Sequence, residues 1–504
     1  MCAIVLSACS AAGPDFKRPD APKAGGYAPQ STPEETTAST VANGEAQHFH
    51  VEKDVPFDWW TLFQSPQLNS LIERSFKTNP TIEAAQAALR QAHQYTAAQR
   101  GFFYPNVGAS YSPSRNKLAG NMGGNSPGVQ GDGSVIQTYS NPAGPEFNGP
   151  AYYNFHTAQF SVGYTPDIFG SNRRQVEAML AREEMQHYQL AATYITLASN
   201  VVAAALQEAS LRAQIGAQNK ILALNRDNLV ILEKQLKLGA ASRMDVLAQE
   251  AAVAQAEQLL IPLQMQLEQT RTLIRALAGN LPNEDVAEKF ELSDLHLPQE
   301  LPLSLPSKLV EQRPDVRAAE AQYHAASAQV GVAAAARLPQ FQLTAAVGGM
   351  ASSPDWMFRS GGSFFNLLGN MTLPIFDGGS LKAQEKAARE ALIQAGASYR
   401  STVIVAFQNV ADALYTIHAD AEALKANAKT EQAMKAVADI TRKQHQAGYV
   451  SYQAVLFAEQ NYQQAAINLI QAQTNRLGDT AALYQALGGG WWNQKETQGK
   501  VAEK

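Results

Sequence analysis

The chain contains two copies of one long pattern, which means that any fold it adopts must be built twice. Pro80 recurs as Pro314, 234 residues later, and Gly239 recurs as Gly448, 209 residues later. The offset of 209 stays constant from about residue 170 to residue 279, and such a constant register indicates internal duplication. The two offsets differ by 25 residues, so the first copy carries an insertion. We place it in the Gly-rich stretch 112–150, which we expect to be a long exposed loop.

Each element of the first copy follows from its periodicity. Asn79 and Pro80 predict a helix start, with the helix running over about 80–103. Apolar residues alternate over 107–111 and again over 160–164, which predicts two strands. The stretch 171–237 contains no proline and has a heptad-like apolar pattern, so it predicts one long helix, followed by another over 242–278.

The second copy repeats this plan. We expect helices over about 315–338, 380–446 and 451–487, with strands that begin at Phe341 and Phe364. A helix of about 66 residues is about 100 Å long, and the two shorter helices of a copy together reach about 90 Å. Two short helices can therefore lie alongside one long one, with small Ala-rich faces that allow close approach.

The four predicted strands imply assembly of several chains if the sheet is to cross a membrane. An open sheet leaves backbone groups unpaired at its edges, and lipid offers them no partners. The smallest closed membrane barrels have about eight strands. Two chains would supply eight strands and three would supply twelve, and the periodicity leaves both possibilities open.

The first residues predict a lipid anchor. Leu6-Ser7-Ala8-Cys9 matches a bacterial lipobox, in which the cysteine is lipidated and becomes the first mature residue. The basic segment of a signal peptide is not seen, so we expect the natural start to lie upstream. The alternative is a buried apolar terminus with an incidental cysteine. From Ser10 to Pro56 the chain is polar and proline-rich, which predicts an extended tether without a core of its own.

The sequence offers little for catalysis or for nucleic-acid binding. The net charge is −5, so no basic field indicates nucleic acid. The stretch Gly124–Gly128 has the spacing of a nucleophile elbow, but Pro127 lacks the N–H that an oxyanion hole needs. His48 and His50 are candidate metal ligands without an accompanying acidic cluster, and we interpret them as surface residues. We therefore expect no catalytic residue, no cofactor and no resident metal.

Several motifs together resemble those of a known family. They are DWWTLF (58–63), LPSKLVEQRPDVRAAE (305–320), LPIFDGG (373–379), ALGGGW (486–491) and the lipobox followed by GPDFKRP. In combination they resemble the TolC-like outer-membrane efflux family, and the most similar branch is that of the OprM/NodT-type lipoproteins. The resemblance covers essentially the whole mature chain.

The resemblance implies a fold and a function. The fold is mostly α with a small β part: a homotrimer whose long antiparallel helices form an α-barrel continuous with a 12-stranded outer-membrane β-barrel, four strands per chain. The function is a passive exit duct of a tripartite, RND-type efflux pump. Its partners are a periplasmic adaptor (membrane fusion) protein and an inner-membrane transporter, with no nucleic acid. The alternative is a lipid-anchored helical scaffold, which would have no need for amphipathic strands.

The expected organisation follows from the repeat. It comprises a signal remnant (1–8), a lipid-anchored extended segment (9–57), a first repeat (58–282), a linker (283–312), a second repeat (313–490) and a tail (491–504).

The turns between the long helices are the candidate periplasmic tip, where the resemblance places contact with the adaptor. The predicted tip residues are Gly239, Ala240, Ser242, Gly448, Tyr449 and Ser451. Gly suits the left-handed end of one helix, and Ser suits the cap of the next. The alternative is that these are only tight turns between packed helices.

The aperture of the duct is expected just after the second turn. The family places acidic residues there, but the aligned positions are Ala454 and Phe457, so this sequence departs from a carboxylate ring. Gln453 and Gln460 share a helix face with Phe457. We hypothesise an apolar constriction of three Phe457 side chains; the alternative is that Phe457 packs sideways between helices. Asp245, the first-copy equivalent of Ala454, is expected to bond across neighbouring helices.

Overall fold

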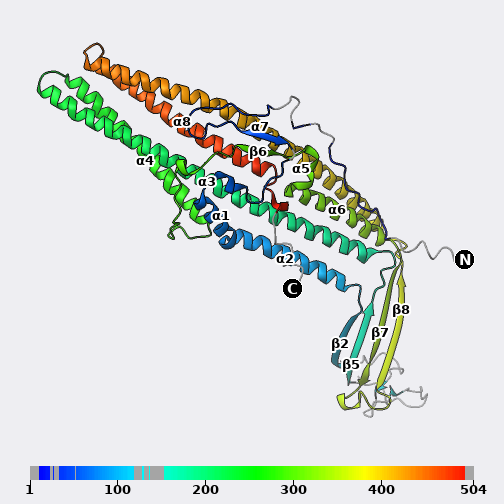
Figure 1. Ribbon diagram of the computed structural model, residues 1–504. Coiled ribbons are helices and arrows are strands. Elements are labelled where there is room, and N and C mark those ends of the chain that lie inside the picture. Colours follow the sequence, from blue (N-terminus) through cyan, green and yellow to red (C-terminus); the bar gives the residue numbers. More distant parts are fainter. Residues whose placement is uncertain are drawn as a thin grey trace. The chain divides into compact units, whose positions relative to one another are not determined.

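The computed structural model describes residues 11–22, 26–27, 33–51, 53–117, 128–129, 135–136 and 152–493. The chain divides into two compact units, and each is described by itself (Figure 1). The strand unit comprises 1–17, 91–183 and 322–396, and the helical unit comprises 18–90, 184–321 and 397–504. Each unit therefore draws on both sequence repeats, and neither repeat is a compact body of its own.

The strand unit is built around a four-stranded antiparallel sheet with the order β2-β5-β7-β8. Its strands are β2 (Asn106–Lys117), β5 (Tyr152–Tyr164), β7 (Gln340–Ala351) and β8 (Ser363–Thr372). A short separate pair joins β3 (Gly128–Val129) to β4 (Val135–Ile136). The strand β2 corrects one sequence expectation, because residues 112–117 continue it rather than opening a loop. Residues 118–127, 130–134 and 137–151 of the predicted loop lie outside the described part of the chain.

The register of the sheet confirms the predicted alternation. Ala109 pairs with Phe160, which pairs with Val347, which in turn pairs with Phe365. Directly opposite residues of an antiparallel sheet point to the same face, so these four side chains form one apolar row. The neighbouring row, Val107, Val162, Ala345 and Leu367, is also apolar. One face of the sheet is thus apolar across all four strands.

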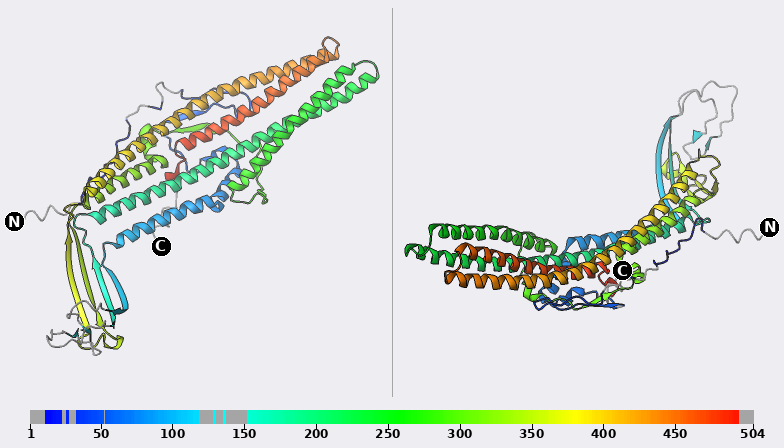
Figure 2. Two further views of the ribbon diagram at one scale, coloured as in Figure 1. Left: turned by 180° about the vertical axis from the view of Figure 1, so that it is seen from behind. Right: turned by 90° about the horizontal axis from the view of Figure 1, so that it is seen from above.

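Eight α-helices are described. They are α1 (Pro66–Thr78), α2 (Pro80–Gly101), α3 (Ser171–Lys237), α4 (Arg243–Leu277), α5 (Pro306–Gln312), α6 (Pro314–Ala335), α7 (Ser380–Gln446) and α8 (Tyr452–Ala486). The predictions for the two 67-residue helices, α3 and α7, are confirmed. In the helical unit α3 lies beside α4, and α7 beside α8, in both views of Figure 2.

The core of the helical unit forms around its aromatic residues. Trp59 and Phe63 belong to the short 3-10 helix η1 (Trp59–Phe63), and both are buried. The Trp59 ring stacks on Tyr484 of α8 with centroids 5.4 Å apart. The helix α3 has a stretch apolar and long enough to cross a membrane by composition alone. More than half of that stretch is buried inside the chain, as in the core helix of a packed unit.

The proline-rich N-terminal segment is packed where it is described, contrary to the expectation of a tether without a core. In the helical unit, strand β1 (His48–Val51) pairs in parallel with β6 (Glu300–Leu303). The Arg476 side chain of α8 is fully buried and donates to Thr36 Oγ1 at 3.0 Å and to the Glu45 carbonyl at 2.6 Å. Burying this guanidinium requires such acceptors, so α8 and the segment hold each other in place.

The strand unit binds its own part of the N-terminal segment. Arg174 of α3 is buried and donates to the Ala12 carbonyl at 3.1 Å and to the Asp15 carboxylate at 2.6 Å. Phe16 stacks on His324 of α6 with centroids 4.4 Å apart. The N-terminal segment therefore packs against the strand unit here too, without regular secondary structure. Cys9, the predicted lipid anchor, lies outside the described residues.

Candidate functional site

Two turns in the helical unit close the long helix pairs with the same backbone geometry. Gly239 has φ +74° and Gly448 has φ +78°. In the first turn the Ala240 N–H donates to the Gln235 carbonyl at 2.8 Å, and in the second the Tyr449 N–H donates to the Gln444 carbonyl at 2.9 Å. Both are left-handed helix ends that satisfy otherwise unpaired carbonyls, as glycine permits. The predicted turn geometry is confirmed, and the predicted contact with an adaptor remains a prediction.

The two turns differ in how the next helix starts. In α4, Ser242 and Asp245 form a capping box: the Asp245 N–H donates to Ser242 Oγ at 3.2 Å, and the Asp245 carboxylate accepts from the Ser242 N–H at 3.1 Å. In α8, Ser451 precedes the helix without a side-chain cap, contrary to the sequence expectation, and the Ala454 N–H donates to the Ser451 carbonyl at 3.1 Å instead. Ala454 stands in the place of Asp245 and has no carboxylate to complete a capping box. Within one chain Asp245 thus caps its own helix, whereas the sequence led us to expect a bond across helices.

A buried polar network joins three helices near the turns. The Tyr452 hydroxyl of α8 donates to Gln249 Oε1 of α4 at 2.6 Å. Gln249 Nε2 in turn donates to the Asn225 carbonyl of α3 at 2.6 Å. Burial raises the pKa of Tyr452. The repeat gives no hint of this network. The position equivalent to Gln249 in the second repeat is Ala458, and the position equivalent to Tyr452 in the first is Arg243, so the same bond cannot form there.

The α8 residues predicted for the aperture share one exposed face. Gln453, Phe457 and Gln460 are all exposed, and Phe457 shows 67% of its surface. The opposite face of α8 is buried by Tyr452 and Val455, which pack against α3 and α4. Phe457 is therefore not part of the packing within one chain. Its direction in an assembled protein remains a prediction.

The tips also expose large apolar side chains. Leu238 and Tyr449 follow the ends of α3 and α7 and show 83% and 82% of their surfaces, and Met244 at the start of α4 shows 75%. Single exposed apolar residues are common on proteins. Three large apolar side chains gathered at the ends of two helical hairpins offer apolar surface on which a partner could pack.

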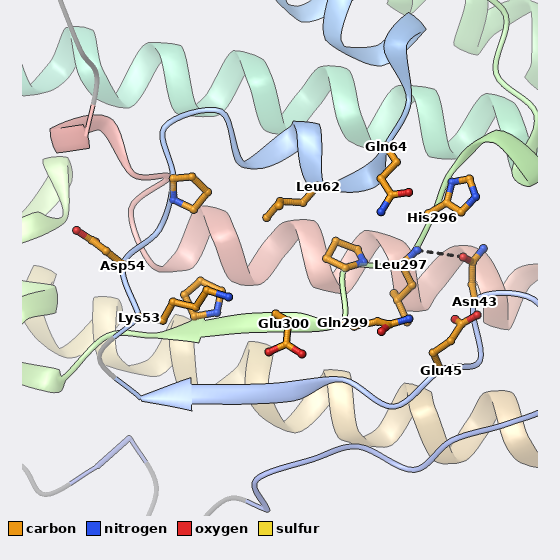
Figure 3. Close-up of a pocket in the computed structure, with 13 residues that line it drawn as sticks. Asn43, Glu45, Lys53, Asp54, Leu62, Gln64, His296, Leu297, Gln299 and Glu300 are labelled. Atoms are coloured by element: carbon orange, nitrogen blue, oxygen red, sulfur yellow. Dashed lines mark hydrogen bonds between the residues drawn. The ribbon is translucent and has the colours of Figure 1, made fainter.

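A pocket of about 570 Å³ opens elsewhere in the helical unit, between η1 and strand β6 (Figure 3). Asp54 accepts from the Trp492 indole at 3.0 Å, and Glu300 of β6 pairs with His50. His48, the other predicted metal candidate, lies 3.5 Å from the Glu35 carboxylate. Within the described residues, no group of three potential metal ligands is found. Asp54 and Glu300 thus have partners from the chain itself, and the described lining brings together no catalytic constellation.

A pair of carboxyl groups between α7 and α8 was also missed by the sequence reasoning. Burial, followed by a hydrogen bond with Asp479, raises the pKa of Asp420 to about 8. The nearby Arg476 guanidinium opposes this shift. With its proton bound, Asp420 carries no charge and can lie partly buried beside Asp479.

A model of the family described as outer membrane efflux protein matches residues 71–280 and 305–489. The chain is 30% identical over 447 residues to the pyoverdine export outer membrane protein OpmQ of Pseudomonas aeruginosa, covering 87% of this chain and 88% of that protein. It is 27% identical over 492 residues to the toluene efflux pump outer membrane protein TtgC of Pseudomonas putida, covering 98% of this chain and 95% of that protein.

Solved structures share the fold. The outer-membrane channel OprN superposes with a TM-score of 0.80 at 25% identity, covering 95% of this chain and 99% of that one. The Campylobacter jejuni CmeC outer membrane channel superposes with a TM-score of 0.81 at 20% identity, covering 98% of each chain.

Proposed function

The chain belongs to the outer membrane efflux protein family and acts as an exit duct of the outer membrane, and we propose how it assembles, closes and engages its partners. The proposed assembly is a homotrimer whose three sheets close into one 12-stranded barrel. It works with a periplasmic adaptor protein and an inner-membrane transporter, for which the RND type is the proposal. The cargo is small molecules such as drugs.

The observation that carries the assembly is the sheet itself. Its two outer strands, β2 with 12 residues and β8 with 10, each leave one edge unpaired within the chain. A sheet with an apolar face and open edges is unsuited to lipid until other copies cover those edges. The same apolar face argues against a helical scaffold, which has no use for it.

The proposed adaptor contact lies at the two turns. Gly239 and Gly448 hold the chain in a conformation that other residues adopt at a cost, and Leu238, Met244 and Tyr449 present apolar surface beside them. A helical hairpin of an adaptor would bury these side chains. The lipid anchor at Cys9 is part of the same proposal and holds the N-terminal segment to the outer membrane.

The assembly is tested with purified protein in detergent and then in planar bilayers. Chemical crosslinking should give a ladder that ends at three chains, and reconstituted protein should conduct ions. A ladder that ends at two chains would favour an eight-stranded barrel, and protein that never conducts would contradict the duct.

The proposed closure is an apolar ring of Phe457 side chains. Three phenyl groups, one from each chain, at a narrow point would exclude water and block ions by dewetting. Phe457→Ala should raise the resting conductance and the sensitivity of cells to large antibiotics. Gln460→Ala, on the same exposed face, is the matched control and should change the conductance less. If Phe457→Ala leaves the conductance unchanged while lowering thermal stability, Phe457 packs between chains and does not line the aperture.

A further inference from the structure

The sheet of the strand unit has a second face, opposite the apolar one, that is polar without charge. On β5 its side chains include Phe155, Thr157, Gln159, Ser161 and Gly163, and on β7 they include Gln342, Thr344, Ala346, Gly348 and Met350. Apart from the apolar Phe155 and Met350 near one end of the face, these residues offer hydroxyl groups, amides or little bulk. This face therefore exposes neutral hydrogen-bonding groups along both central strands.

The edge strands continue the same chemistry. On β2 the polar face presents Asn106, Gly108, Ser110, Ser112 and Ser114. On β8 it presents Asn366 and Asn370, together with the apolar Phe364 and Leu368. Within the described strands, Arg115 belongs to the opposite face, beyond the apolar rows, where it pairs with Asn154. Lys117, the last residue of β2, stands two positions further along and pairs with Tyr152.

The small side chains leave a hollow in this face. Its volume is about 240 Å³, and Asn106, Ser161, Thr344 and Asn366 contribute polar groups to its lining. These residues come from all four strands, so the hollow is a property of the register and not of one loop. A hydroxyl or amide donates and accepts hydrogen bonds without attracting one sign of charge.

We propose that this face lines the barrel as an uncharged wall, so that the barrel passes cations and anions without preference and offers only weak hydrogen bonds to the neutral polar groups of its cargo. The proposal rests on the proposed trimeric duct, in which the apolar face meets lipid and the polar face meets water. Ion selectivity in channels commonly arises from rings of charged side chains. Here the wall supplies hydroxyls and amides in their place.

The wall can be given a charge of either sign at Ser161. The hollow around Ser161 has room for a longer side chain, and three chains would place a ring of three charges in the barrel. Reversal potentials are measured in planar bilayers under a KCl gradient for the wild-type protein, Ser161→Lys and Ser161→Asp. Ser293→Lys and Ser293→Asp, at an exposed serine of the helical unit, are the controls.

If the wall is neutral, the two substitutions should shift the ion permeability ratio in opposite directions and by similar amounts. At about 0.01–0.03 M salt, Ser161→Lys should shift the permeability ratio about threefold toward chloride and Ser161→Asp about threefold toward potassium. Both shifts should shrink at 1 M salt, where the Debye length is about 3 Å. A response to only one sign, or to neither, would show that other charges already dominate the barrel and would overturn the proposal. Protein without any conductance, wild type included, would overturn the duct itself.

Discussion

Replacing Asp420 with asparagine should make the protein more stable in base and change it little in acid. Burial and the neighbouring Asp479 raise the pKa of Asp420 to about 8, so near neutral pH the Asp420 carboxyl keeps its proton and forms a hydrogen bond with Asp479. The ordinary aspartate pKa is 3.8, as in the unfolded chain. A group with a raised pKa in the folded state stabilises the fold fully below pH 3.8, and this contribution is lost as pH rises through about 8.

The magnitude follows from the same difference. A pKa moved from 3.8 to about 8 corresponds to an upper limit of about 6 kcal/mol lost between acid and base. Asp420 is only half-buried, so screening by water reduces the expected loss to about 1–3 kcal/mol. An asparagine amide donates to Asp479 at every pH and needs no proton, and therefore Asp420→Asn avoids the loss.

The assay is thermal unfolding of the detergent-solubilised protein, followed by helical circular dichroism at one fixed scan rate. Between pH 6 and pH 9 the wild-type Tm should fall by about 2–4 °C more than that of Asp420→Asn. Asp412→Asn, at an exposed aspartate of the same helix, is the matched control and should follow the wild type. If Asp420→Asn lowers the Tm equally at pH 6 and pH 9, Asp420 is ionised in the native protein and the reasoning is wrong.

Three further predictions concern the anchor, the tip and the insertion. Cys9→Ala should abolish fatty-acid labelling of the protein, and label that persists would remove Cys9 as the anchor. A Cβ at Gly448 would meet nothing within 4 Å, so Gly448→Val strains only the backbone, by about 1–2 kcal/mol. Adaptor-dependent efflux should fall more than the abundance of the trimer does. Normal efflux at normal abundance would mean that the site is only a tight turn. Deleting about 25 residues within 118–150 should leave a folded trimer on gels, because loop length has a small entropic effect, and aggregation would mean that the segment packs inside.

Local elements of this protein can be predicted from the sequence because they depend on neighbours a few residues away. Proline and asparagine at 79–80, the uninterrupted stretch 171–237 and the glycines of the two turns each set a helix boundary through their own backbone preferences. The alternation over 107–111 likewise sets which side chains share a face of a strand. The duplication determined that these elements occur twice.

Tertiary structure decided what depends on residues far apart along the chain. Arg476 is buried only because Thr36 and Glu45, more than 400 residues earlier, supply its acceptors, and this contact turns a proline-rich segment into packed structure. Asp420 keeps its proton because the packed helices bury it and because Asp479 lies on the adjacent helix. Periodicity describes one element at a time. Burial, the pairing register of strands and the raised pKa of Asp420 arise only where elements pack together, so only the folded chain reveals them.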